Sequence, residues 1–292
     1  RSHAVGVGEL LPEEEVRATM VIRINTLIQG NSGIRPELVQ LLVNFLNKGI
    51  HPCIPSKGSV GASGDLAPLA HMSLCLIGEG EVIFQGCKME ALSALKQTGL
   101  KPATLVSKEG LALINGTAVM CGIGTLALLD SERLAKMADI SGAMSLEALK
   151  GTDEFLREEI HKLRPHKGQI DSASNMRKLI KGSKILAKFR DSGKIQDAYS
   201  VRCIPQVHGA SRDTFRHVRS VLEIEVNSVT DNPLVILKSS EIVSGGNFHG
   251  QPIAFVMDFL AISVAEIANI AESRVSRLIN SRYSDLPPFL VK

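Results

Sequence analysis

The sequence predicts a mainly α fold, a bundle of long helices with an irregular loop region and one small β-hairpin. Three observations indicate this class: long stretches repeat apolar residues every three or four positions, strand-like runs are few, and glycine- and proline-rich segments separate the helical ones. Of the 292 residues, 44% are hydrophobic and 22% are charged, which is typical of a globular protein. The 33 Lys and Arg nearly balance the 30 Asp and Glu, so neither nucleic acid nor an anionic membrane is expected as a partner.

The first helix is expected to begin at Pro12, because proline fits the first turn and the three glutamates that follow favour the positive end of the helix dipole. Its apolar face comprises Val16, Met20, Ile24 and Leu27. Further helices are expected over residues 36–48, ended by Gly49, over 111–149 with possible breaks at Gly116, Gly122, Gly124 and Gly142, and over 212–229 and 252–279.

The remaining segments are read as a hairpin and two loops. Residues 82–89 alternate around Gln85-Gly86, which favours a small hairpin. Residues 49–68 are rich in glycine, proline and serine, and residues 152–200 are rich in charge and glycine, so both are expected to be loops.

Cysteine usage and hydropathy suggest a cytoplasmic protein. The five cysteines form no CxxC pair, which argues against a disulfide framework or a thiolate metal site and favours a reducing compartment. The longest near-continuous apolar run, residues 119–129, is too short for a bilayer, so no membrane span is expected. The chain opens without methionine or a signal-peptide pattern, and we expect a piece of a longer protein.

The most unusual segment is residues 57–69, and its spacing excludes three familiar motifs. Asp65 follows Gly64 where a phosphate-binding P-loop needs lysine, and the same aspartate stands where a nucleophile elbow needs glycine. The glycine spacing also differs from a dinucleotide fingerprint. A plain glycine-rich turn remains one interpretation.

A second interpretation is chemical. The nitrogen of Gly64 is unhindered and can attack the carbonyl of Ala62, and loss of two waters then converts the side chain of Ser63 into an exocyclic methylidene. The product is an electrophile made from the chain itself, which no ordinary side chain supplies.

Residues 58–69, Gly-Ser-Val-Gly-Ala-Ser-Gly-Asp-Leu-Ala-Pro-Leu, resemble the signature of the aromatic amino acid ammonia-lyases, which contain a methylidene-imidazolone group. Three further segments resemble motifs of this family in the same order: residues 109–117, 196–203 and 244–249. These four separated motifs are distributed across nearly the whole chain. The resemblance implies that residues 1–292 are one partial lyase domain, with 49–110 as the electrophile loop region, 111–292 as the central helical bundle, and the family's N-terminal and C-terminal portions absent.

Within the family the resemblance is nearest to the members that act on histidine. It implies elimination of ammonia from L-histidine to give urocanate, the first step of histidine degradation, by a homotetramer with shared active sites and without an external cofactor or metal. Two alternatives stay open. One is a lyase or aminomutase acting on tyrosine or phenylalanine, and the other is a catalytically silent, truncated subunit.

The resemblance also implies catalytic residues. Ala62, Ser63 and Gly64 form the electrophile, which captures the substrate amine and makes it a better leaving group. Asn115 lies beside the electrophile, although a buried amide in an apolar helix is also explained by a helix-to-helix hydrogen bond. Tyr199 positions or exchanges protons, and Phe248 packs beside the group or belongs to the ordinary core.

Three residues are expected to bind the substrate. Arg202 has the bidentate geometry that suits the α-carboxylate, although alone it reads as a surface residue. Gln196 resembles the family's substrate-contacting glutamine. His3 is expected to hydrogen-bond the imidazole of the substrate, although a histidine so near a chain end is usually disordered.

The sequence leaves two roles open for Asp65, and two groups of the family pattern lie outside residues 1–292. Asp65 either assists the dehydration or caps the helix that follows it. The resemblance implies that the family's catalytic tyrosine lies upstream of Arg1 and that a glutamate used near the imidazole lies beyond residue 292, so activity of this chain alone would require a general base from elsewhere. The histidines His161 and His166 lack the spacing of a helical metal pair and are expected to be structural or exposed.

Overall fold

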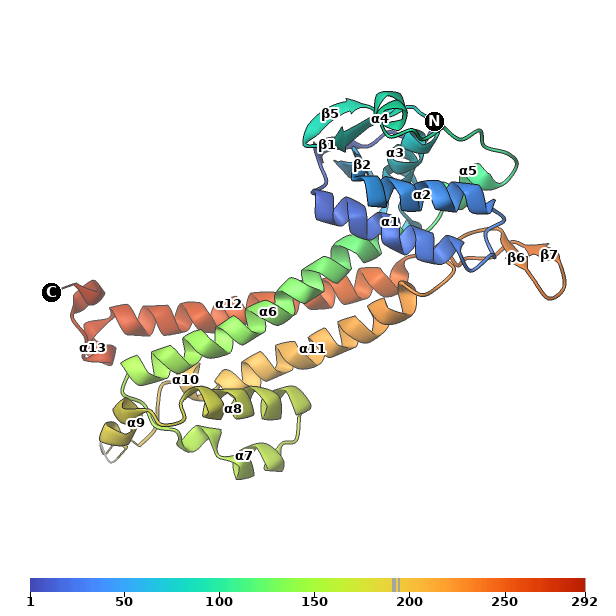
Figure 1. Cartoon of the computed structure of the whole chain (residues 1–292). Helices are drawn as coiled ribbons and strands as arrows, with labels where there is room; N and C mark the ends of the chain where they lie inside the picture. The colour runs from blue at the N-terminus through green and yellow to red at the C-terminus, as the bar shows by residue number, and fades with distance from the viewer. Residues whose placement is uncertain (191–192, 194, 292) are drawn as a thin grey trace. The chain divides into compact units, whose positions relative to one another are not determined.

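The computed structural model describes residues 1–190, 193 and 195–291, and its element content confirms the mainly α class. The chain divides into two compact units. Unit 1 is Arg1–Ala127 with Ser220–Val256, and unit 2 is Leu128–Arg219 with Met257–Lys292. The divisions fall inside three long helices, α6 (Ala118–Ala148), α11 (Ile204–Glu225) and α12 (Gln251–Ile279), as Figure 1 shows.

Unit 1 combines short helices with small antiparallel sheets. The hairpin predicted over residues 82–89 is confirmed as β4 and β5, and β2 completes a three-stranded sheet in the order β2-β4-β5. A second, two-stranded sheet pairs β1 with β3. The elements of this part are β1 (Val7–Leu10), α1 (Glu13–Leu27), α2 (Pro36–Lys48), β2 (Ile50–Pro52), β3 (Pro55–Lys57), α3 (Leu66–Leu76), β4 (Glu81–Phe84), β5 (Cys87–Glu90), α4 (Ala91–Gln97) and α5 (Glu109–Ile114).

The first helix begins directly after Pro12, and the second has the predicted bounds. Gly49 ends α2 in the left-handed conformation, with a φ of 68°, so that its N–H reaches the last carbonyls of the helix. The predicted apolar face of α1 is wrong at one position, because Arg23 is fully buried whereas Ile24 is partly exposed. The guanidinium of Arg23 finds backbone carbonyls at the centre of unit 1, which a pattern of apolar spacing does not reveal.

The helix predicted over residues 111–149 breaks at only one of its glycines. It ends at Ile114 and restarts as α6, with Gly116 in the interruption. Gly122 continues the helix because its missing side chain lets the backbone of Thr19 approach, and an added Cβ would lie 3.0 Å from the nitrogen of Thr19. Gly142 likewise gives room to Ile204 within unit 2. These glycines therefore serve close packing.

Unit 2 corrects the prediction that residues 152–200 form a loop, because the described part of this segment contains three helices and the start of a fourth. These are α7 (Glu158–Leu163), α8 (Lys167–Leu179), α9 (Lys184–Phe189) and α10 (Tyr199–Arg202), with a short 3-10 turn at Glu154–Leu156. These helices bury few apolar side chains. The exposed charged residues between them obscure the helical periodicity of the sequence. The core of unit 2 contains Ala143, Leu146, Leu149, Leu156, Ala173, Met176, Ile180, Leu186, Val201 and Ile204.

Two further features differ from the predictions: the residue at which α11 begins, and the presence of stretches long enough to span a bilayer. α11 begins at Ile204 rather than at 212, because Pro205 suits the first helical turn. Both the stretch Glu109–Ala148 and α12 are long and apolar enough to cross a bilayer by length and composition. The expectation that no segment reaches that length is therefore wrong, because each of these stretches contains an 18-residue window with at most two charged residues.

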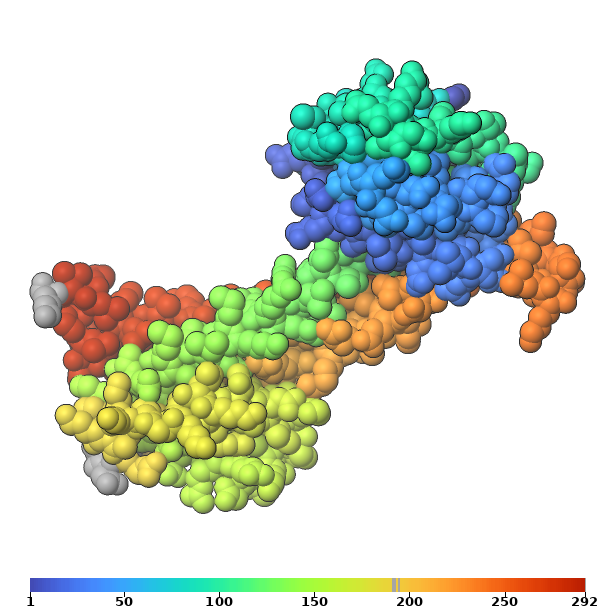
Figure 2. Space-filling view, in the orientation of Figure 1, coloured from blue at the N-terminus to red at the C-terminus, as the bar shows by residue number. Residues whose placement is uncertain are grey.

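A hairpin formed by β6 (Leu234–Ile236) and β7 (Glu241–Val243) completes unit 1. The turn after α1 holds it, because the N–H of Val235 donates to the carbonyl of Asn31 at 2.8 Å and the side-chain amide of Asn31 donates back to Val235 at 2.8 Å. In Figure 2 the orange side chains of this hairpin project beside the blue N-terminal part of unit 1. The connection from β7 to α12 contains Phe248.

Candidate active site

The tripeptide Ala62–Gly64 lies in a tight turn between β3 and α3. Residues Gly61–Ser63 form one turn of 3-10 helix, and the N–H of Gly64 donates to the carbonyl of Gly61 at 2.9 Å. The carbonyl of Gly64 accepts a hydrogen bond from the N–H of Val60 at 3.2 Å. Ser63 is exposed, whereas Gly64 is buried. The turn therefore presents the serine side chain outward.

Two distant segments of unit 1 reach this turn. The carbonyl of Ala62 accepts a hydrogen bond from the N–H of Gly250 at 2.7 Å. A Cβ on Gly64, whose φ is 107°, would lie 3.6 Å from the carbonyl oxygens of both Gly116 and Phe248. The structure thus brings the predicted motifs around residues 62–64, 115–116 and 248–250 to one place.

Asp65 links the turn to the beginning of α6. Its side chain is fully buried, and Oδ2 accepts hydrogen bonds from the N–H groups of Val119 at 3.0 Å and Met120 at 2.9 Å. Oδ1 accepts a third from the hydroxyl of Ser59 at 2.8 Å. The expectation that this side chain caps the following helix is wrong, because it makes no capping bond to α3. It occupies the positive end of α6 instead.

Burial sets the protonation of Asp65. Loss of water raises the pKa of this carboxyl to about 6, although the hydrogen bonds from Met120, Ser59 and Val119 and the charge of Arg23 oppose the rise. The pKa of this group therefore lies near neutral pH, directly beside the predicted tripeptide 62–64.

Asn115 lies in the interruption between α5 and α6 rather than within a helix, with extended backbone angles of −97° and 113°. Its side-chain amide donates to the carbonyl of Asn232 at 3.0 Å. The side-chain oxygen of Asn232 in turn accepts from the N–H of Gly245 at 2.7 Å. Asn115 is thereby connected with the predicted motif at 244–249.

Arg23 and Gly116 fix this interruption. The guanidinium of Arg23 donates to the carbonyl of Thr230 at 3.1 Å and also to the carbonyl of Ala112. A Cβ on Gly116 would lie 2.5 Å from both a guanidinium nitrogen of Arg23 and the carbonyl oxygen of Thr230, so glycine is required. Burial lowers the pKa of Arg23 to about 10, while the charges of Asp231 and Asp65 oppose the shift.

His3 is exposed at the edge of unit 1, and its Nδ1 lies 3.1 Å from the hydroxyl of Ser2. It lines a cavity of about 160 Å³ together with side chains of α3 and α5, among them Ile114, the neighbour of Asn115. His3 therefore lies close to the segment that leads to Asn115.

The other predicted residues belong to unit 2, which contains Gln196, Tyr199 and Arg202. Gln196 is exposed, and Tyr199 is 70% exposed. The guanidinium carbon of Arg202 lies 5.9 Å from the ring centre of Tyr199, and its Nε is buried without a hydrogen-bond partner among the residues that the structure describes. The Nε of this arginine is thus a donor that no described residue satisfies.

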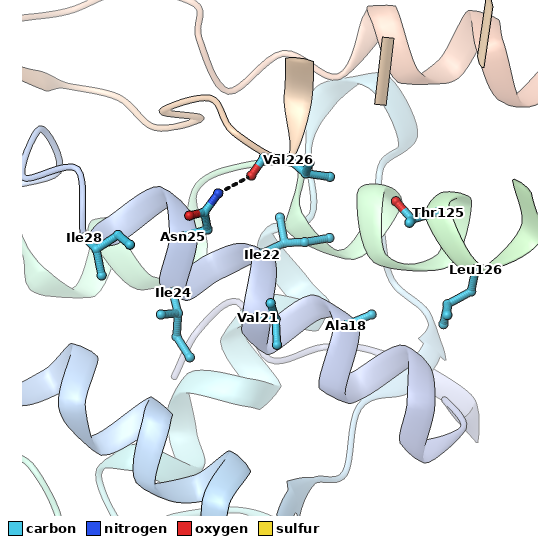
Figure 3. A pocket seen from close by; sticks show the side chains of 9 residues that line it. All are labelled: Ala18, Val21, Ile22, Ile24, Asn25, Ile28, Thr125, Leu126 and Val226. Carbon is cyan, nitrogen blue, oxygen red and sulfur yellow. Dashed lines mark hydrogen bonds between the residues drawn. The ribbon is translucent and has the colours of Figure 1, made fainter. Parts of the chain in front are cut away.

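Unit 1 also contains an apolar groove of about 490 Å³ that lacks the chemistry of an active site. Figure 3 shows it between α1 and α6, with the amide of Asn25 donating to the carbonyl of Val226 at 2.7 Å. Its lining contains no titratable side chain: Ala18, Val21, Ile22, Ile24, Asn25, Ile28, Thr125, Leu126 and Val226.

Sequence reasoning missed Ser59, Arg23 and Gly250 as members of this site. The signals were weak: Ser59 lay inside the motif but had no assigned role, and Gly250 directly follows the predicted motif at 244–249. His161 is buried as a structural residue, with its ring nitrogens 3.1 Å from the carbonyl of Phe155 and 3.0 Å from the amide of Gln169. Over the described part of the chain, no three His, Cys, Asp or Glu residues group as metal ligands.

The sequence as a whole, residues 1–292, matches the aromatic amino acid lyase family. The chain belongs to this family. Among similar members is a histidine ammonia-lyase of Koribacter versatilis, 52% identical over 99% of this chain and 59% of that protein. A histidine ammonia-lyase of Treponema denticola is 52% identical over the full chain and 57% of its own length. This lyase-family chain therefore spans less than three fifths of these relatives.

Solved structures of the family share the fold. A tyrosine aminomutase from Streptomyces globisporus is 45% identical, with a TM-score of 0.93 over 100% of this chain and 58% of its own. The histidine ammonia-lyase from Trypanosoma cruzi is 44% identical, with a TM-score of 0.91 over 100% of this chain and 55% of its own. The family match thus includes lyases and aminomutases.

Proposed function

We propose that this chain is the electrophile-forming part of a histidine ammonia-lyase, which eliminates ammonia from L-histidine to give urocanate. The observation that supports it best is the turn at Ala62–Gly64, with the Ala62 carbonyl bonded to the Gly250 N–H and the ionisable Asp65 next to it. Histidine is favoured as substrate because relatives that are 50–52% identical in sequence to this chain are histidine ammonia-lyases.

The residues of this turn fit a methylidene-imidazolone made from Ala62, Ser63 and Gly64. Gly64 has a φ of 107°, which a side chain would strain, and its nitrogen is two residues from the carbonyl that it must attack. The Gly250 N–H, 2.7 Å from the Ala62 oxygen, polarises that carbonyl in the manner of an oxyanion donor. Once formed, the group supplies an electrophile that captures the substrate amine and needs no external cofactor or metal.

The atoms of this formation step balance as two waters. The nitrogen of Gly64 bonds to the carbonyl carbon of Ala62 and passes its proton to the oxygen. That oxygen leaves as water with the amide proton of Ser63. The hydroxyl of Ser63 then leaves as a second water together with the α-proton of Ser63. A double bond remains between the α- and β-carbons of this residue.

Three residues bind the substrate. The guanidinium of Arg202 pairs with the α-carboxylate, since its Nε has no other partner in the described chain. Gln196 and His3 contact the polar ends of the substrate, with His3 hydrogen-bonded to the imidazole. Tyr199 exchanges protons in the elimination.

Asn115 and Phe248 complete the catalytic set. Asn115 orients the amine from the interruption between α5 and α6, and Phe248 excludes water beside the electrophile. Both roles are consistent with the backbone contacts of their segments to Gly64.

The working enzyme is a homotetramer in the cytoplasm, with active sites shared between copies. The long helices support this, because apolar side chains remain exposed along them: Met137 at 64%, Met144 at 66% and Ile262 at 63%. Such faces suit burial against helices of other copies, and they explain the bilayer-like composition of α6 and α12 without a membrane.

Intact mass of the purified chain beside its Ser63→Ala variant tests the electrophile. The original chain should lack two waters and the variant should have its full mass. Full mass in both would contradict the proposal and favour a silent subunit. Comparing turnover of L-histidine with that of L-tyrosine and L-phenylalanine by the full-length enzyme then tests the substrate, and preference for tyrosine would favour the aminomutase class instead.

A further inference from the structure

Ser59 lies just before the tripeptide and contacts the residues on both sides of it. Its hydroxyl donates to Oδ1 of Asp65 at 2.8 Å, and the same oxygen accepts a hydrogen bond from the N–H of Gly61 at 3.2 Å. Gly61 directly precedes Ala62, and Asp65 directly follows Gly64. One side-chain oxygen therefore joins the two ends of the segment that must cyclise.

We propose that Ser59 is a positioning residue for electrophile formation, which holds the two ends of the tripeptide together and orients the Asp65 carboxylate beside it. This inference rests on the proposed function, because it concerns the formation of the same prosthetic group. Ser59 contributes no atom to the product and acts through Gly61 and Asp65.

The cyclisation needs such a restraint because an intramolecular attack is fast only when the reacting atoms are held close. Before cyclisation, the N–H of Gly64 is bonded to the carbonyl of Gly61 rather than directed at Ala62. The segment must therefore change its hydrogen bonds while staying compact. Fixing Gly61 on one side and Asp65 on the other limits the conformations that it can visit.

The bond from Ser59 also acts on the charge of Asp65. A hydroxyl that donates to a carboxylate stabilises its ionised form, and Ser59 is one of three donors to this buried group. Burial nevertheless keeps the pKa of Asp65 at about 6. Without the hydroxyl, that pKa should rise further, and the ionised carboxylate should form only at higher pH.

Four variants test this role: Ser59→Ala, Ser59→Thr, Ser63→Ala and, as a matched control, Ser56→Ala at an exposed serine of β3. Each full chain is made by cell-free synthesis, and its intact mass is followed with time while circular dichroism reports the helices. Ser59→Ala should fold but lose its two waters about ten- to a hundredfold more slowly than the original chain, which is the effect of one charge-assisted hydrogen bond. Ser59→Thr and Ser56→Ala should match the original chain.

A pH series separates positioning from a merely structural effect. The rate of water loss in the original chain should fall as the pH drops through about 6, where Asp65 becomes protonated, and in Ser59→Ala this fall should move to higher pH. Should Ser59→Ala fail to fold, Ser59→Cys takes its place. Its thiol is a weak donor, so it must still mature more slowly than Ser59→Thr.

Water loss from Ser59→Ala at the rate of the original chain, with an unchanged pH profile, would overturn the role of Ser59 and leave the proposed function standing. Full mass of the original chain itself would contradict the proposed function, and the role of Ser59 with it. The two failures are distinguishable because the original chain loses its waters in the first case only.

Discussion

Two fully buried aspartates, Asp65 in unit 1 and Asp139 in unit 2, differ in what surrounds them. Asp65 in unit 1 accepts hydrogen bonds from one hydroxyl and two backbone N–H groups, all neutral donors. Asp139 in unit 2 is bonded by His208 at 2.8 Å and by the guanidinium of Arg212 at 2.6 Å. Ser172 and Asn175 donate to Asp139 as well.

The two carboxyls therefore have opposite pKa shifts. At Asp139 burial acts to raise the pKa, but the hydrogen bonds from His208 and Asn175 and the charge of Arg212 outweigh it, so the pKa is lowered. At Asp65 burial wins, and the pKa is about 6. A buried carboxylate with a cationic partner is a fixed anion that joins helices, whereas one with neutral donors can exchange a proton near neutral pH.

The largest effect is expected at Asp139. Asp139→Ala should lower the free energy of unfolding by about 3–5 kcal/mol, because Arg212 and His208 would stay buried without their acceptor. Urea denaturation followed by circular dichroism measures it. Asp139→Asn, which keeps one acceptor oxygen, is the matched variant and should lose less. A loss below about 1 kcal/mol in the alanine variant would show that this cluster does not hold unit 2 together.

The next effect concerns pH and Asp65. Because its pKa rises from 3.8 to about 6 on folding, the stability it contributes is fully present below pH 3.8 and is lost as the pH rises through 6. The difference in unfolding free energy between the original chain and Asp65→Asn should therefore fall by roughly 3 kcal/mol over that range.

Measuring the difference between the two chains cancels the titration of other groups. Asp139 should show the opposite sign, since a lowered pKa contributes stability above pH 3.8 that is lost on further acidification. A difference between the original chain and Asp65→Asn that does not change between pH 4 and 7 would mean that Asp65 is no titrating group in this range.

The smallest effect is expected at an exposed carboxylate of unit 2. Asp171 pairs with Lys167 at 3.1 Å and with Arg216 at 3.4 Å, but its side chain is 40% exposed. Asp171→Asn should change the free energy of unfolding by less than about 1 kcal/mol, because water and salt screen such pairs. If Asp171→Asn lowered the free energy of unfolding as much as Asp139→Ala in the same urea titration, burial would not explain the difference between the two sites.

The sequence was a good guide where a local signal has a local cause. Pro12 and Gly49 mark helix ends because proline and glycine restrict or release the backbone at those residues. The tripeptide at 62–64 is recognisable because the cyclisation that we propose for it depends on three adjacent residues. The prediction of a loop over residues 152–200 is wrong because the helices there are short, and their exposed charged residues outnumber the few residues that enter the core.

What the sequence determined by itself is the mainly α class, the positions of the longest helices, the family and the tripeptide at 62–64. Only the tertiary structure decided that Asp65 binds the start of α6 rather than the helix after it, that Arg23 is buried, and that the Gly250 N–H meets Ala62. The physical reason is distance along the chain. Hydrogen bonds and desolvation between segments tens to hundreds of residues apart depend on packing, which no local spacing records.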